Sequence, residues 1–144
     1  MKNVCETRGN VYPKSVDRVQ LQRIETALFQ SFGPDTLRED QVSSWDQADP
    51  ANNQCVMAAL VVNHLLPQFD QVVNDDVIDH YWGRSSTTLE EIDFTRCQHQ
   101  LAGKFPEIRR IRPAGQLFEG ERAVSAKTQQ RFEILLRRTL ANLK

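Results

Sequence analysis

The chain has 144 residues, enough for one domain with a buried core, and its 18 basic and 19 acidic side chains give a formal net charge of −1. This balance offers no general attraction to nucleic acid or to an anionic membrane, and we expect neither partner. The longest strongly apolar run, residues 56–62, is too short to cross a bilayer, and the N-terminus lacks the apolar core of a signal peptide, so we expect a soluble, cytoplasmic protein.

The first half of the chain predicts two helices. Apolar residues recur at helical spacing in the first of them, at Leu21, Ile24, Leu28 and Phe32. Gly33 and Pro34 end this helix, and the polar residues 34–53 predict an ordered loop. The second helix begins near Asn53 and ends before Pro67. Because it is apolar on most sides, we expect it at the centre of the domain.

The period changes after Pro67, and residues 72–95 predict two or three strands. In the first arm Val77, Asp79 and Tyr81 alternate with Ile78, His80 and Trp82, and the turn-forming sequence GRSSTT separates this arm from a second one at residues 89–95. We therefore expect a hairpin. Residues 95–102 predict a short helix that ends at Gly103, and residues 104–121 are irregular.

The C-terminal region predicts another amphipathic helix. Apolar residues recur there at helical spacing, at Phe132, Leu135, Leu136, Leu140 and Leu143, and Ser125 is the expected N-cap. With no repeat, linker or low-complexity tract, residues 1–144 are expected to form a single domain.

The chain has three cysteines, Cys5, Cys55 and Cys97, which form no CxxC pair and favour reduced thiols over a disulfide framework. Cys55 lies in the first turn of the second predicted helix. There it is close to unpaired N–H groups at the positive end of the helix dipole, which favours the reactive thiolate. The alternative is that Cys55 is a small apolar core residue.

The hairpin supplies candidate partners for this thiol. If its arms pair symmetrically about the SSTT turn, His80 lies directly opposite Asp93 on one face, where the carboxylate can accept a proton from one imidazole nitrogen. A slip of one residue would turn one of the two side chains to the other face. Taken separately, His80 also fits a half-exposed strand histidine and Asp93 a strand-end cap. Together with Cys55 they form the pattern of a nucleophile triad.

Several motifs resemble those of the YunG-like family, a group of small, uncharacterised bacterial proteins, and they cover almost the whole chain. They are Trp45, Asp49-Pro50, Gln54-Cys55-Val56, His80-Tyr81-Trp82, Glu91-Ile92-Asp93-Phe94-Thr95 and Arg131-Phe132-Glu133-Ile134-Leu135. The sequence departs from the family at Asn53, where glycine is usual, and at Gly83, where asparagine is usual. Neither change removes a proposed triad residue.

The order cysteine, histidine, aspartate is similar to that of papain-like, NlpC/P60-like and transglutaminase-like enzymes. This resemblance implies an α+β fold in which a central helix carries Cys55 and packs on a small antiparallel sheet, with flanking helices. It implies a thiol hydrolase or acyl transferase that attacks an amide or ester bond of a peptide, protein or small amide substrate without a cofactor. For substrate or oxyanion binding we single out four residues, namely Gln54, Asn53, Trp82 and Trp45.

Other interpretations stay open. A non-catalytic binding module can retain the same scaffold, and Cys97 with His99 suggests a metal site, although the second ligand pair of a structural zinc site is missing, so no metal is expected. Arg109, Arg110 and Arg112 form either a solvated surface or a site for phosphate or an acidic partner. The sequence leaves the substrate and the oligomeric state undetermined.

Overall fold

The computed structural model describes residues 9–47, 49–51, 53–96, 103–119 and 123–144. Its helices are α1 (Arg18–Ser31), α2 (Cys55–Leu65) and α4 (Ala123–Asn142), and its strands are β1 (Gln71–Asp75), β2 (His80–Arg84), β3 (Glu91–Ile92) and β4 (Arg110–Pro113). Short 3₁₀ helices lie in the connections: η2 (Pro34–Thr36), η3 (Glu39–Ser44) and η4 (Ala114–Phe118).

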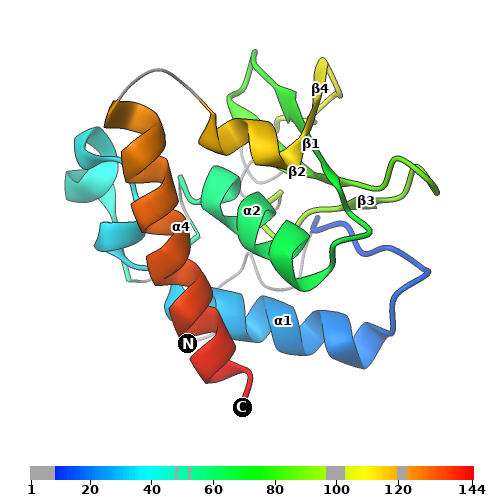
Figure 1. Cartoon of the computed structure of the whole chain (residues 1–144), viewed down its shortest axis with the longest axis horizontal. Coiled ribbons are helices and arrows are strands. Elements are labelled where there is room, and N and C mark those ends of the chain that lie inside the picture. Colours follow the sequence, from blue (N-terminus) through cyan, green and yellow to red (C-terminus); the bar gives the residue numbers. More distant parts are fainter. Residues whose placement is uncertain (1–8, 48, 52, 97–102, 120–122) are drawn as a thin grey trace.

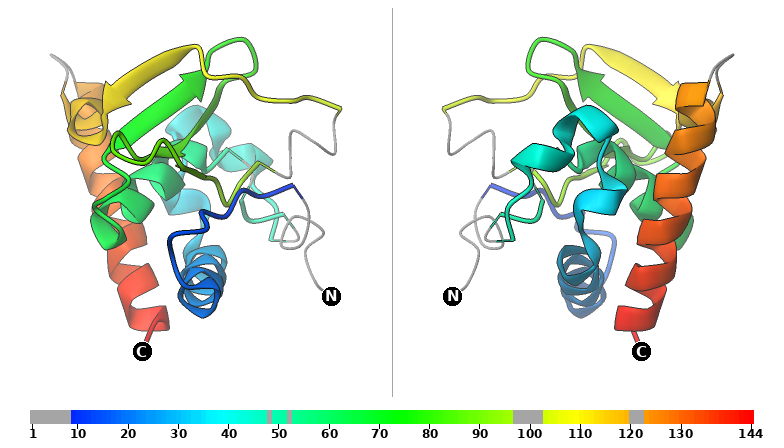
Figure 2. Two further views of the ribbon diagram at one scale, coloured as in Figure 1. Left: turned by 90° about the vertical axis from the view of Figure 1, so that its right-hand side faces the viewer. Right: turned by 90° about the vertical axis from the view of Figure 1, so that its left-hand side faces the viewer.

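The strands form one antiparallel sheet in the order β3-β2-β1-β4 (Figure 1). The side views show α1, α2 and α4 on one side of this sheet (Figure 2). Helix α2 packs on β2 and on α4, and α1 packs on α4. The predicted α+β class with a small antiparallel sheet is therefore confirmed, and the helices lie on one side of that sheet.

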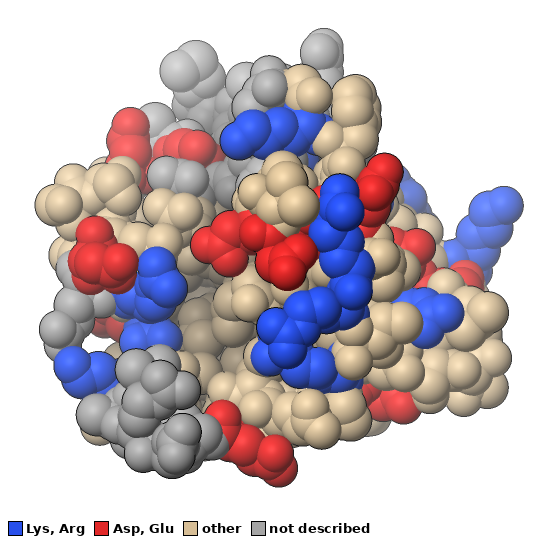
Figure 3. All heavy atoms as spheres, turned by 90° about the horizontal axis from the view of Figure 1, so that it is seen from above, with Lys and Arg blue, Asp and Glu red and all other residues tan. Residues whose placement is uncertain are grey.

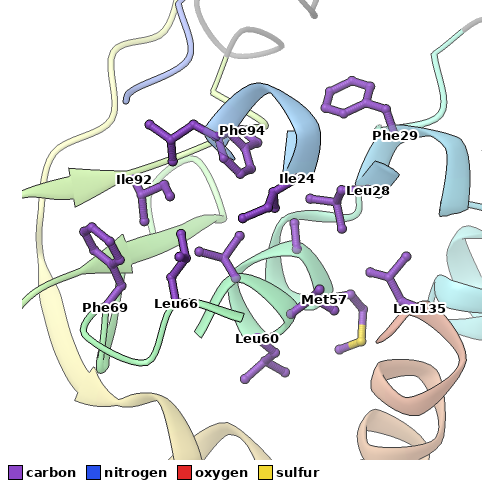
Figure 4. Close-up of a cluster of buried hydrophobic side chains, with 14 of the residues drawn as sticks. Ile24, Leu28, Phe29, Met57, Leu60, Leu66, Phe69, Ile92, Phe94 and Leu135 are labelled. Carbon is purple, nitrogen blue, oxygen red and sulfur yellow. The ribbon is translucent and has the colours of Figure 1, made fainter. Parts of the chain in front are cut away.

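Helix α2 is central because its sequence is apolar on nearly every side. All its residues from Met57 to Val62 are buried, and most of them join Leu28 of α1 and Leu135 of α4 in the main core (Figure 4). Burial of a large apolar side chain contributes about 1.5–3 kcal/mol. Since α2 is enclosed by α4 and the sheet, the position of its N-terminus is fixed by the core.

The three longer helices that the sequence predicts are present in the structure as α1, α2 and α4, in the predicted order. Helix α1 begins at Arg18 because Asp17 caps it, accepting a hydrogen bond from the Gln20 N–H at 3.1 Å. Helix α4 begins at Ala123, so the predicted N-cap at Ser125 is wrong: this serine lies inside the helix, which the neighbouring alanines favour. None of the described helices combines the length and the apolarity that a membrane span requires.

The strand region differs from the prediction at two places. Residues 77–79 form the turn between β1 and β2 instead of the start of a strand, and Asp79 has a positive φ of 54° there. Strand β4 lies in a segment predicted to be irregular, because an exposed edge strand lacks the apolar alternation that marks a half-buried one. The short helix predicted for residues 95–102 falls mainly outside the described residues; residue 96 is in a turn.

Gly83 permits the close approach of β2 and β3. A Cβ atom placed on it would lie 2.8 Å from Cγ2 of the buried Ile92, its partner across the strands. We expect Gly83→Ala to lower the free energy of unfolding by about 1–3 kcal/mol, because Ile92 must leave its rotamer or the strands must separate. Urea unfolding followed by circular dichroism measures this change.

Gly115→Ala is the matched control, since a Cβ there meets no atom within 4 Å. Its expected effect is within about 0.5 kcal/mol. Equal stability of the two variants would contradict the close packing of Gly83 on Ile92.

Candidate active site

Cys55 is the first residue of α2, in the first turn of the helix as the sequence predicts. Gln54 is the N-cap residue, and its buried side chain ties this end of the helix to η2: Nε2 donates to the Gly33 carbonyl at 3.0 Å, and Oε1 accepts from Thr36 Oγ1 at 2.8 Å. The Gln54 amide is thus engaged within the protein and fixes the position of Cys55. The Cys55 side chain itself is half-buried and carries a free thiol.

His80 begins β2, and Asp93 follows directly after β3. Their side chains are 0% and 1% exposed, and His80 Nε2 lies 2.7 Å from Asp93 Oδ2. The two residues therefore meet, but the predicted register is wrong: the strands pair Gly83 with Ile92, which displaces His80 by two residues from the position opposite Asp93. A shift of two residues keeps both side chains on the same face, so the contact becomes diagonal and stays within reach.

Asp93 is held through both its backbone and its carboxylate. Its N–H donates to the Val11 carbonyl at 3.0 Å, and its own carbonyl accepts from the Val11 N–H at 2.8 Å. The carboxylate accepts from the Thr95 N–H and from Arg96 Nε, each at 3.0 Å. Burial raises the pKa of Asp93, but the charge and hydrogen bond of His80 and the charge of Arg96 outweigh burial and hold the pKa below its usual value. Asp93 is therefore ionised at neutral pH.

Trp82 packs against His80. The two rings are stacked, with 5.4 Å between centroids and 22° between planes, and the Arg96 guanidinium lies 4.8 Å from the Trp82 centroid. Trp82 Nε1 donates to Glu91 Oε1 at 2.6 Å. Because the Trp82 side chain is buried, it orients the imidazole from within the protein.

Cys55 completes the surroundings of His80. Burial by itself lowers the pKa of His80, whereas the charge and hydrogen bond of Asp93, followed by the hydrogen bond and charge of Cys55, raise it, and the resulting pKa is about 10. Since Asp93 occupies Nε2, Nδ1 is the ring nitrogen that remains for the Cys55 side chain. The structure thus brings together the three residues that the sequence singled out.

A cavity of about 260 Å³ opens at Cys55. Its lining comes from distant segments and includes Arg38, Asn53, Val56, Asp79, Tyr81, Leu117 and Arg131. The Cys55 Sγ lies 3.9 Å from the Asp79 carbonyl oxygen at its wall. Of the four residues singled out for binding, Asn53 lines this cavity, whereas Gln54, Trp45 and Trp82 do not.

The arginines that the sequence groups together, Arg109, Arg110 and Arg112, differ in their surroundings. The Arg109 Nε donates to Asp75 Oδ1 at 2.7 Å, and Arg112 also lines the cavity. Viewed from the side on which β4 lies, basic side chains form a band next to a group of acidic ones (Figure 3). Arg109 therefore belongs to a surface of paired charges, and Arg112 belongs to the wall of the cavity.

Sequence reasoning missed two supports of the site, Val11 and Arg96. Neither carried a signal, because Val11 is distant in sequence from its partner Asp93 and the arginine sits in an ordinary polar turn.

Metal ligands do not gather in the described part of the chain, where no three His, Cys, Asp or Glu side chains are grouped to hold an ion. Cys97 and His99, the residues that suggested such a site, lie outside the described residues.

Comparison with known proteins identifies one family. The family model described as YunG protein matches residues 20–144, which is most of the chain and includes Cys55, His80 and Asp93. No curated protein and no solved structure matches the chain.

The raised pKa of His80 predicts how stability changes with pH. Between the ordinary value of 6.5 and about 10 the folded protein keeps a proton on His80 that the unfolded chain has lost. The contribution of this group is therefore complete below 6.5 and is lost as the pH rises through 10, with a slope of up to about 1.4 kcal/mol per pH unit. Urea unfolding measured across this range tests the slope.

The matched comparison is the same measurement on His80→Gln with Cys55 unchanged, because Cys55 contributes to the raised pKa of His80. This variant should flatten the dependence between these limits. An equally steep fall in both proteins would assign the effect to another group.

Proposed function

This chain belongs to the YunG family, and we propose that it is a thiol hydrolase or acyl transferase that attacks an amide or ester bond. One observation carries the proposal: the Cys55 side chain, at the start of a buried helix, meets an imidazole whose other nitrogen lies 2.7 Å from the Asp93 carboxylate. A thiol, a histidine and a carboxylate in this order are the parts of an activated nucleophile.

In the resting site we assign a thiolate to Cys55 and an imidazolium to His80. The thiolate is the nucleophilic form of cysteine, and a positive imidazolium beside it favours that form. The pKa of about 10 for His80 supports this charge distribution. Asp93 keeps the positive ring oriented and electrically balanced.

The first step is attack of the Cys55 sulfur on the carbonyl carbon. A C–S bond forms and the carbonyl π electrons move to oxygen; when they return, the bond to the leaving amine or alcohol breaks and His80 gives that group its proton. The products are a thioester on Cys55 and a neutral His80.

The second step restores the site. Neutral His80 takes a proton from water as the water oxygen attacks the thioester, the C–S bond breaks, and thiolate and imidazolium are regenerated with release of a carboxylic acid. An amine in place of water gives acyl transfer. Attack by Cys55 is common to both outcomes.

The developing oxyanion needs donors. We assign the Cys55 N–H, because the first N–H groups of a helix have no acceptor within the helix. Asn53, which lines the cavity beside Cys55, is the proposed second donor, since the Gln54 amide already bonds to Gly33 and Thr36.

We further propose that the scaffold is a papain-like core. The support is the placement of the proposed nucleophile at the start of the central helix, of the proposed base at the start of β2, and of its carboxylate directly after the neighbouring strand β3. This part of the proposal is an analogy of arrangement.

Alkylation of the cysteines by iodoacetamide, followed site by site by mass spectrometry, tests the proposal. Cys55 should react about ten-fold faster than Cys5 and Cys97 at about pH 6, because ordinary thiols are protonated there. His80→Ala should remove this advantage, and Asp93→Asn should reduce it by weakening the charge on the imidazole.

His64→Ala is the matched control, since His64 lies on the exposed side of the same helix and should leave the Cys55 rate unchanged. If Cys55 reacts no faster than the other cysteines in folded protein and ignores the His80 change, it is a core residue. The scaffold would then be a binding module.

A further inference from the structure

One oxygen of the Asp93 carboxylate has two nitrogen partners. His80 Nε2 lies 2.7 Å from Asp93 Oδ2, and Arg96 Nε donates to the same oxygen at 3.0 Å. The other oxygen, Oδ1, accepts from the Thr95 N–H at 3.0 Å. The Asp93 side chain is 1% exposed and the Arg96 side chain 14% exposed, so water screens these charges little. His80 therefore shares its carboxylate with a permanent cation.

Arg96 is fixed near the imidazole by further contacts. Its Nη2 lies 3.6 Å from Glu91 Oε1, and its guanidinium carbon lies 4.8 Å from the Trp82 centroid. The Trp82 ring in turn stacks on His80, with 5.4 Å between centroids. Arg96 and His80 are thus joined through one carboxylate and one indole ring. A like charge held so close disfavours the protonated form of His80.

The proposed reaction needs a histidine that can lose its proton. His80 gives a proton to the leaving group in the first step, and it must be neutral when it takes one from water in the second. In the resting site both Asp93 and Cys55 favour the protonated ring. Acylation removes the charge of the Cys55 sulfur, but the carboxylate remains. Its full charge beside a buried imidazole would keep the ring protonated at neutral pH.

We propose that Arg96 is a positioning residue that shares the Asp93 carboxylate with His80, limits the charge that His80 meets, and so frees its proton during catalysis. This inference rests on the proposed function and deepens the account of the same site. Arg96 is not among the described residues that line the cavity at Cys55, so it acts through Asp93 and not on the substrate.

The simpler alternative is that Arg96 only holds Asp93 in place. The two roles predict opposite results when the arginine is removed. If Arg96 limits the charge at His80, its loss raises the pKa of the imidazole. If Arg96 only orients the carboxylate, its loss weakens the contact between Asp93 and His80, and the pKa falls.

Other charged groups near His80 come from separate elements. Asp75 of β1 pairs with His80 in the strand register, and its carboxylate accepts from Arg109 Nε at 2.7 Å and from the Glu107 N–H at 2.9 Å. Among the described residues, the charged ones that line the cavity at Cys55 are Asp79, Arg38, Arg112 and Arg131. The variants that follow retain all these groups, so their contributions cancel when two variants are compared.

Titration of His80 by nuclear magnetic resonance tests the sign. The background is Cys55→Ser, because the sulfur is uncharged in the second step and the serine hydroxyl also stays uncharged. Of the three histidines in the chain, His80 is identified as the one whose signals are missing from His80→Gln. We expect Arg96→Gln to raise the measured pKa of His80 by about 1, a ten-fold change in proton affinity. A fall or an unchanged pKa would overturn the proposal.

Two further variants separate the charge of Arg96 from its packing. Arg96→Lys keeps the charge and should keep the measured pKa of His80 low. Arg96→Met keeps an apolar side chain over Trp82 without the charge and should raise the pKa as glutamine does. If circular dichroism shows that Arg96→Gln is unfolded, Arg96→Met decides the sign.

Arg84→Gln is the matched control. It removes a positive charge from β2, the strand that carries His80, where Arg84 Nη1 donates to Gln71 Oε1 at 2.9 Å. It should leave the pKa of His80 within about 0.3 of its value in the background, because the charge lies away from the shared carboxylate. An equal rise in this variant would show that the effect is not specific to Arg96.

Hydrolysis of p-nitrophenyl acetate, an activated ester, tests the consequence in protein that retains Cys55. Arg96→Gln should keep the initial burst of p-nitrophenol, since attack needs only the thiolate, and should slow the steady phase about ten-fold at about pH 7. The pH at which the steady phase is half-maximal should rise by about 1, in agreement with the titration. Equal loss of both phases would indicate a structural role and contradict the proposal.

Failure of this inference is distinguishable from failure of the proposed function. If the ester gives a burst but Arg96→Gln changes neither the steady phase nor the pKa of His80, the role of Arg96 is excluded and the nucleophile stands. If no burst appears and Cys55 is inert to iodoacetamide, the proposed function fails. The titration still decides whether Arg96 limits the charge at His80: a rise supports it, and a fall or no change overturns it.

Discussion

A protonated histidine can lie in the dry interior of this protein only because Asp93 lies against it. Burial opposes charge on His80, and the carboxylate at 2.7 Å, with the Cys55 side chain, outweighs that opposition. The converse also holds: Asp93 stays ionised because His80 and Arg96 surround it. Removing one partner would leave a buried charge uncompensated, which costs about 3–5 kcal/mol. The catalytic hypothesis and the stability of this part of the core therefore depend on the same contact.

The N-terminal segment supports that contact from outside the region that matches the family. Val11 pairs with the backbone of Asp93, while Asn10 donates to Glu25 Oε2 and to the Phe94 carbonyl. Tyr12 donates to the same Glu25 oxygen at 2.7 Å. These bonds join the segment to α1 and to the residues that follow β3. Residues 10–12, which precede the family match, thus stabilise a site that lies within the matched region.

The edge of the sheet explains why neighbouring arginines differ. Strand β1 carries Asn74 followed by Asp75, and each meets an arginine from the β4 side: Asp75 neutralises Arg109, whereas Asn74 offers Arg112 only an amide oxygen. The difference between an amide at Asn74 and a carboxylate at Asp75 therefore decides that β1 neutralises Arg109 and not Arg112. Arg112, for which the described residues supply no carboxylate, is the one that lines the cavity at Cys55.

The sequence by itself determined the three longer helices and the place of Cys55 in the first turn of α2, because apolar periodicity and helix-breaking residues act within a few positions of one another. It also determined that His80 and Asp93 share a face, since alternation along the strands has period two and survives a shift of two residues. It did not determine the register, strand β4, or the roles of Val11, Arg96 and Arg112. These depend on contacts between segments far apart in the chain, and an exposed edge strand or an arginine in a polar turn has no local pattern that identifies its partner. Only the packing of the sheet against α2 and α4 decided which distant charges meet at Cys55.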